Sequence, residues 1–444
     1  ALNLEAKTLK NDATLGEAYK FNFSAIDIAI DTQTVVRSGG ATRAFVNEGA
    51  SITATGLKVD AQANVNKASI DKKVSFTATA AQAGTISTTV ETAHRTEAYL
   101  GRRGGFSPTT DPGSITVGGD IAVTANSDNA AKFGGGFDLT FGAVDLQNVR
   151  DRVSTGGTTR AYVGGKFRVS GGDINVKANA RNAATSDESS LSLKGINSGG
   201  ETKTIETTHE AEAFVGYNSV IDLVNGAGVA TGALNLEAKT LKNDATLEET
   251  YNFNLSAIDI AIDTQTVVRS RGATRAFVDE RASITATNLT VNAEAKQNNA
   301  TIEKGVSFDL TGADLGAVTT KAETAHVTEA FFGPQGGGAP TNFATGTIDV
   351  GGAIEVHADS NNTATIDEGF NFDLAVIDLK KFNPVVDASG TTRAYIGGRF
   401  TIDNGNVNVT ANSSSSAKSK TLSFEITGVG AGTTSSQTSA THDT

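Results

Sequence analysis

The sequence contains no cysteine, no methionine and no tryptophan, and only five of its 444 residues are proline. Without cysteine the chain has no disulfide framework, no thiolate metal site and no cysteine nucleophile. No run of about 18 apolar residues occurs, so the sequence predicts no membrane-spanning helix, and no signal peptide is visible. Five prolines and 48 glycines are typical of extended segments separated by tight turns rather than of helices.

Basic residues are fewer than acidic residues, so the formal net charge is -12. Binding to nucleic acid needs clustered Lys and Arg, so the acidic balance argues against such a partner. Methionine is missing even at residue 1, and the chain stops in mid-pattern at Thr444. We therefore expect a processed chain or a piece of a longer protein.

What the sequence does have is repetition. Residues 1–46 and 233–278 are identical at 41 of 46 positions, so the chain repeats itself after 232 residues. A period of this length in a chain rich in Thr, Asn, Gly and Ala indicates an array rather than one catalytic domain. We expect two long repeats, residues 1–232 and residues 233–444, with the second one truncated.

The differences between the two copies show a two-residue alternation. Polar changes fall on even positions of the first copy, as where Lys20 corresponds to Asn252, whereas Phe23 corresponds to Leu255 on an odd position. This pattern is typical of a β-strand with one wet and one dry face. We therefore expect the odd positions here to face the protein interior.

A smaller unit of about 58 residues, four per long repeat, carries three strand types in a fixed order. The first reads apolar-x-apolar-x-Ala, as in Leu57-Val59-Ala61, and occurs eight times. The second, about 19 residues on, contains apolar pairs two residues apart. From these pairs we expect one structural core residue per unit, namely Phe21, Phe76, Phe137, Leu191, Phe253, Phe308, Phe372 and Phe424.

The sequence thus predicts an all-β fold, an elongated repetitive β-solenoid (β-helix) of eight units. One coil cannot bury its own dry face, whereas coils stacked at about 4.8 Å complete the backbone hydrogen bonds and build a continuous core. A buried Phe at each level would contribute roughly 2–3 kcal/mol.

The third strand type reads Thr-[Arg/Glu]-Ala-aromatic, and the sign of its charge alternates from unit to unit. The residues of this expected charge ladder are Arg43, Glu97, Arg160, Glu212, Arg275, Glu329 and Arg393. Each unit could form three coils of about 19 residues or one wide, flattened coil. Three coils would separate the charges by roughly 14 Å, beyond the Debye length of about 8 Å. Alternation therefore favours one wide coil, with opposite charges on neighbouring levels.

The aromatic residues of the same strands share a face with these charges, so we expect that face to be at least half exposed. Two interpretations remain open, a surface ladder with Arg stems over rings or a lateral contact stripe. The residues concerned are Phe45, Tyr99, Tyr162, Phe214, Phe277, Phe331 and Tyr395. Longer loops follow every second such strand, at residues 101–113, 216–232 and 333–346, and are candidate contact sites.

The distribution of the histidines indicates whether they form an active site. His94, His209, His326 and His442 are spaced 115, 117 and 116 residues apart. A side chain that recurs in every second unit is expected to have a structural rather than a catalytic role. The alternative interpretation is a column of histidines that responds to acid. No close His pair or calcium-loop spacing occurs. We therefore expect no catalytic residue, no metal and no cofactor.

TEAYLG at Thr96, TRAYVGG at Thr159 and DINVKANARNAAT at Asp173 resemble the repeat region of large secreted bacterial filamentous adhesins, of the leukotoxin-like and filamentous-haemagglutinin-like kind. The resemblance implies a β-solenoid stalk at the cell surface or outside the cell, used in adhesion or biofilm structure. The sequence contains no RGD motif, and the resemblance does not imply toxicity.

We therefore expect a non-enzymatic extracellular structural protein, a fibre or stalk segment that self-associates axially or laterally. Surface glycans or a host or neighbouring cell are further partners that this expectation allows, whereas nucleic acid and membrane insertion are not. The alternative is a carbohydrate-binding or carbohydrate-cleaving β-helix that acts through the long lateral loops.

Overall fold

The computed structural model describes residues 1–47, 49–105, 115–337 and 345–444, and these are almost entirely β-strand. The elements are β1 (Leu2–Thr8), β2 (Asn11–Asn47), β3 (Ile52–Ala54), β4 (Leu57–Gly101), η1 (Arg103–Gly105), β5 (Ile115–Val117), β6 (Ile121–Val163), β7 (Lys166–Val169), β8 (Ile174–Gly199), β9 (Glu201–Val215), β10 (Val220–Leu223), β11 (Leu234–Val278), β12 (Ser283–Ala286), β13 (Leu289–Phe332), η2 (Gln335–Gly337), β14 (Gly346–Val350), β15 (Ala353–Ile396), β16 (Phe400–Asp403), β17 (Asn406–Gly430), β18 (Thr433–Thr434) and β19 (Gln437–Asp443), of which η1 and η2 are 3₁₀ segments.

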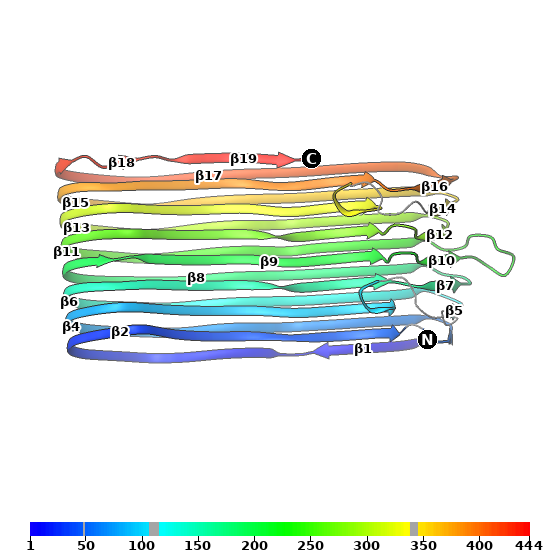
Figure 1. Ribbon diagram of the computed structural model, residues 1–444, viewed down its shortest axis with the longest axis horizontal. Helices are drawn as coiled ribbons and strands as arrows, with labels where there is room; N and C mark the ends of the chain where they lie inside the picture. The colour runs from blue at the N-terminus through cyan, green and yellow to red at the C-terminus, as the bar shows by residue number, and fades with distance from the viewer. Residues whose placement is uncertain (48, 106–114, 338–344) are drawn as a thin grey trace.

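All strand pairs of the two sheets are parallel. The large sheet of 12 strands follows the order β1-β4-β6-β8-β11-β13-β15-β17, and the small sheet of seven follows β16-β14-β12-β10-β7-β5-β3. In Figure 1 the long strands lie side by side in chain order from the N-terminus to the C-terminus, with the small sheet at one end. Thr, Val and Ile are frequent in these strands, in agreement with their preference for pleated, half-buried surfaces.

Each long strand folds back on itself. Side-chain hydrogen bonds join residues placed symmetrically about Ala25: Thr8 with Thr42 at 2.6 Å, and Asn22 with Asp27 at 2.6 Å. The chain therefore reverses near Ala25, at the end of the molecule away from the small sheet (Figure 1). We call the part before the reversal the outbound arm, the part after it the return arm, and one unit of both arms a rung.

Successive units pair directly, with one rung per unit. Leu57 pairs with Leu2 on one side and with Ile121 on the other. Pairing also continues into the second long repeat, where Leu234 lies between Ile174 and Leu289. Equivalent residues of all units thus form columns that run across the sheet.

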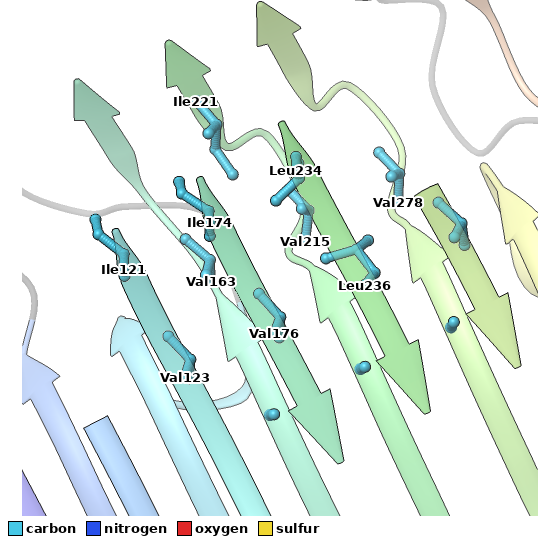
Figure 2. Packing of buried hydrophobic residues seen from close by; sticks show 14 of the residues in the cluster. Ile121, Val123, Val163, Ile174, Val176, Val215, Ile221, Leu234, Leu236 and Val278 are labelled. Carbon is cyan, nitrogen blue, oxygen red and sulfur yellow. The ribbon is translucent and has the colours of Figure 1, made fainter. Parts of the chain in front are cut away.

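The main apolar core lies between the two arms and the small sheet. Figure 2 shows Ile121 and Val123, Ile174 and Val176 at matching places on successive strands, close to Val163. A neighbour on each side of a rung produces this burial. The column that begins with Leu2 shows the effect, because Leu57 is 3% and Ile354 is 0% exposed, whereas Val407 on the last rung is 46% exposed.

A second apolar cluster, around Ile70, Val90 and Val268, lies nearer the reversal. Between this cluster and the reversal, the face that we expected to be solvent-exposed points inward, and the face that we expected to be buried points outward. The inward residues are polar, such as Thr79 and Asp314, which are 6% and 0% exposed.

The expected core ladder therefore lies on the outer surface, and that prediction was wrong in its placement. Phe21 is 66% and Phe424 is 53% exposed, and the remaining members are partly exposed. Phe137 was also assigned to the wrong column, since it pairs with Val74 whereas Leu139 pairs with Phe76. The other seven residues do share one column.

Candidate functional site: the side-chain ladders

The aromatic residues of the third strand type form one continuous stack. Successive ring centroids are 4.7–5.0 Å apart, with interplanar angles of 2–12°. The stack runs through Phe45, Tyr99, Tyr162, Phe214, Phe277, Phe331 and Tyr395. Parallel pairing places equivalent side chains about 4.8 Å apart, which is close to the spacing of stacked rings.

This stack is not an exposed contact stripe, so the expectation of a half-exposed face was wrong. Tyr99, Tyr162, Phe214 and Phe331 are between 0% and 6% exposed. Phe277 and Tyr395 are partly buried, and Phe45, on the first rung, is the most exposed at 45%. The rings point away from the apolar core, because Ala44 and its equivalents face inward, and other parts of the chain cover them.

The long loops provide this cover. The amide of Gly104, in η1, donates a hydrogen bond of 2.7 Å to the hydroxyl of Tyr162. The hydroxyl of Tyr395 donates one of 3.3 Å to the carbonyl of Pro334, next to η2. Burial raises the pKa of the Tyr162 hydroxyl above its ordinary value. The other prolines of the first and third loops, Pro108, Pro112 and Pro340, lie outside the described residues.

The charge ladder pairs across neighbouring rungs. Arg43 lies 2.6 Å from Glu97, and Arg275 lies 3.3 Å from Glu212 and 3.2 Å from Glu329. The remaining members continue the column: Arg160 lies 2.7 Å from Glu212, and Arg393 pairs in register with Glu329 and forms an ion pair with Asp443. Residues of opposite sign are therefore direct neighbours on successive strands.

Sequence reasoning overlooked an interior polar column beside this ladder. In every second rung a Ser or Thr hydroxyl of the outbound arm lies within hydrogen-bond distance of a Thr hydroxyl of the return arm, and this Thr lies within the same distance of an imidazole from the next rung. Ser127 is 2.6 Å from Thr159, which is 2.8 Å from Nε2 of His209. The same arrangement recurs as Thr8–Thr42–His94, Thr240–Thr274–His326 and Ser360–Thr392–His442.

Glycine alternates with histidine in this column. Gly272 lies between His209 and His326, and Gly390 lies between His326 and His442. A Cβ on Gly390 would be 3.1 Å from the His442 ring. A rung with His therefore needs a rung without a side chain beside it, which explains why His recurs in every second unit.

A column of asparagines accompanies the histidines. Asn66, Asn129, Asn182, Asn243, Asn298 and Asn362 are at most 1% exposed. Asn66 donates to Asn129 at 3.0 Å, and Asn129 donates to Asn182 at 2.9 Å. Each of these asparagines comes eight or nine residues after the first apolar residue of its unit, and this recurrence was the signal that could have revealed the ladder.

Buried charges occupy the interior near the reversal. Nζ of Lys203 lies 2.7 Å from Glu188, 3.0 Å from Glu201 and 3.7 Å from Glu249. Burial alone would lower the pKa of Lys203, but the three carboxylates outweigh burial and hold it well above its ordinary value. The group is a satisfied internal ion-pair network.

One acidic group has the spacing of a metal site. The carboxylate oxygens of Asp309, Asp314 and Asp373 lie within 4.8 Å of one another. However, Nζ of Lys380 lies 2.9 Å from Asp314 and 3.5 Å from Asp309, in the place of a cation. Burial raises the pKa of Asp309 to about 7 and that of Asp373 to about 6. Proton uptake and Lys380 thus both reduce the local negative charge.

No protein-family model, curated protein sequence or solved structure matches the chain. In the part of the chain that the structure describes, no apolar helix has the length needed to cross a membrane. The ladders themselves are therefore the basis for any functional inference.

For the charge ladder we predict that Glu97→Arg lowers the free energy of unfolding by about 3–5 kcal/mol, because it leaves Arg43 without its partner beside a buried like charge. The loss should be larger at low salt than at high salt, since salt screens like-charge repulsion. Chemical denaturation at two ionic strengths measures it. The control is Glu91→Arg, whose partner Arg37 is well exposed, with an expected loss of at most about 1 kcal/mol. A salt-independent loss for Glu97→Arg would contradict the pairing of neighbouring rungs.

For the glycine column we predict that Gly272→Ala destabilises the protein by about 3 kcal/mol or more. Gly272 has φ +136°, and an added Cβ would lie 2.2 Å from the carbonyl oxygen of His209. Gly16→Ala is the matched control, because no atom lies within 4 Å of its added Cβ. Thermal unfolding of the two variants checks the prediction, and equal midpoint temperatures of unfolding would contradict it.

For the histidines we predict a loss of stability in mild acid. Burial lowers the pKa of His209 to about 4 and that of His326 to about 3, against about 6.5 in an unfolded chain. Between these values the unfolded chain binds the extra proton and the folded chain does not, so stability falls as the pH drops from about 6.5 to about 4.

His209 should account for about 3 kcal/mol of that loss. The buried acids Asp309 and Asp373 act in the opposite sense, because their raised pKa values favour the folded state as the pH falls. The measurement is therefore the difference between the pH–stability curves of the unmodified protein and His209→Gln. Parallel curves would show that His209 does not contribute.

Proposed function

We propose that this chain is a non-enzymatic structural segment, a β-solenoid fibre or stalk of a large secreted bacterial protein of the filamentous-adhesin or biofilm-matrix kind. The proposal places it outside the cell or at the cell surface. It rests on one observation above all: equivalent residues of the repeated units pair directly, rung upon rung, from Leu2 to Val407.

This register supports a structural role because each rung gains its burial from the rungs beside it. The same strand positions that are buried in the middle rungs are half exposed where a neighbour is missing, as at Val409 with 42% exposure. Added units therefore extend a rod without requiring a new kind of core.

The distribution of chemistry supports the same role. Side chains able to do acid–base work, such as His94 and His209, recur at fixed intervals and form the same hydrogen bonds in each place. An enzyme concentrates such groups at one site that differs from the rest of the molecule. Here their repetition is explained by packing.

The loops give less support to the rival carbohydrate-binding function. The described parts of the first and third loops lie against the aromatic ladder, where Gly104 bonds to Tyr162 and Pro334 to Tyr395. Aromatic rings that bind sugars present a face to solvent. Tyr99 and Tyr162, at 3% and 0% exposure, do not.

Negative-stain electron microscopy of the native material tests the proposal. We expect threads or cell-attached stalks, because stacking along one axis builds a rod. Isolated globular particles would overturn it.

A screen of polysaccharides for binding and for release of reducing sugars tests the rival function. The proposal predicts no turnover. Specific turnover that is abolished by changing a single loop carboxylate would replace the structural role by an enzymatic one.

A further inference from the structure

The outer surface near the reversal carries a block of apolar side chains, which we call the apolar face. It consists of three columns on the outbound arms and one at the reversal. Their first members are Tyr19, Phe21, Phe23 and Ile26, and each column continues through eight rungs. Among all these positions Ser189 is the one polar residue besides the tyrosines, and none is charged.

This face is open to solvent in the middle of the array and not merely at its ends. Leu193 is 47%, Tyr251 48%, Ile258 37% and Leu374 37% exposed. Aromatic contacts along the column, such as Phe253 with Phe308 at 5.3 Å, hold the rings in rows. The rows repeat from rung to rung.

The size of the face matches that of a stable protein interface. Three columns on the outbound arms measure roughly 20 Å across and 35 Å along the stacking axis, or about 700 Å². The largest apolar patch of a monomeric protein is typically about 300–600 Å². A standard interface buries about 800 Å² on each partner, and the column at the reversal adds to the area available here.

The return arms carry less apolar surface. Beside the reversal they present a few exposed apolar side chains, with Ile28 63%, Leu146 46% and Leu379 46% exposed. Farther from the reversal they carry ion pairs, an exposed one between Arg37 and Glu91 at 2.9 Å and a partly buried one between Arg269 and Glu323 at 3.3 Å. The broad apolar block therefore lies on the outbound arms, and removal of water from it would stabilise an interface.

The border of the apolar face restricts what can cover it. The outward column next to the Tyr19 column is mainly acidic, with Lys420 on the last rung as its one basic residue; its acidic members are Asp71, Asp187, Glu248, Glu303 and Asp367. An anionic lipid surface would meet this row of carboxylates and a net charge of -12, which disfavours membrane docking. A second copy avoids the conflict if its acidic column lies at the other edge of the interface.

That condition fixes the geometry of a pair. A two-fold axis parallel to the stacking axis exchanges the left and right edges of the apolar face, so the two acidic columns lie far apart. A two-fold axis along the strands would place the acidic columns over each other, which like-charge repulsion disfavours. The first arrangement also aligns the rungs of the two copies, because both have the same spacing.

We propose that the apolar face is a lateral docking surface for a second copy of this chain, with the two arrays side by side and running in the same direction. The central column, which includes Phe21, Leu191 and Phe253, lies on the symmetry axis and meets its own equivalent. The inference rests on the proposed fibre function and names its partner. It also moves lateral self-association from the buried stack of Tyr99 and Tyr162 to the opposite end of the coil.

Sedimentation over a range of protein concentrations tests the proposal. We expect the unmodified chain to form dimers, and the double variant Leu193→Lys/Leu374→Lys to dissociate at least ten-fold more readily. The matched control is Val35→Lys/Val65→Lys, at positions that are 49% and 41% exposed elsewhere on the surface, and it should keep the dimer. All four substituted positions are solvent-accessible, and circular dichroism confirms that each variant folds. An unmodified chain that remains monomeric, or equal weakening by both variants, would overturn the proposal.

The absence of native cysteine permits a second, orthogonal measurement. A single Leu191→Cys should give a disulfide-linked dimer on mild oxidation, since the same residue of each copy lies at the axis, whereas Val35→Cys should not. Equal cross-linking of both, or flotation of monomers with neutral phosphatidylcholine vesicles, would overturn the proposal. Neither result would affect the fibre function, because threads seen by microscopy can consist of single unpaired arrays.

Discussion

Parallel pairing of each rung with its neighbour is the constraint on which the rest of the structure depends. It places every residue about 4.8 Å from its equivalent in the next unit. Each side chain must therefore pack against a copy of itself, or alternate from rung to rung with a different side chain that complements it. Aromatic rings satisfy the first condition by stacking, as Tyr99 and Tyr162 do. Arg43 and Glu97 satisfy the second by alternation of charge, and His209 and Gly272 by alternation of size.

The interior polar column is where a violation of this constraint costs the most free energy, and it is where the constraint selects one strand register. A strand register that slipped by one residue would still pair backbone groups, but it would turn every side chain to the other face. Buried Asn129 and Thr159 would then lose the partners that satisfy them, and an unsatisfied buried polar group costs about 1–3 kcal/mol. Ile70 and Val123 lie in apolar clusters on either side of the polar column. The polar column therefore fixes the register, and the apolar clusters provide most of the stability.

The sequence predicted the strands, the repeat of one rung per unit and the pairing of alternating charges. It did not predict which side of each strand faces inward. Near the reversal Phe21 alternates with Asn22, and on the return arm Phe45 alternates with Ala44, so periodicity alone defines two faces without telling which one is covered. The interior is set by the opposing arm and by loops distant in sequence, as Gly104 over Tyr162 shows. Large rings lie outside the coil in both cases, while Ala44, Val46 and Leu57 fill the narrow space within.

A surface generated by repetition has a property that ordinary surfaces lack, namely a fixed period along one direction. A ligand without that period can fit one rung but not its neighbours, so its contacts do not accumulate. Another array of the same kind matches at every rung, and a weak contact at one rung, such as that of Leu193 or Leu255, is then multiplied along the axis. The regularity that forces Tyr162 and its equivalents into a stack thus makes a second copy a better partner for the apolar face than a molecule of different shape.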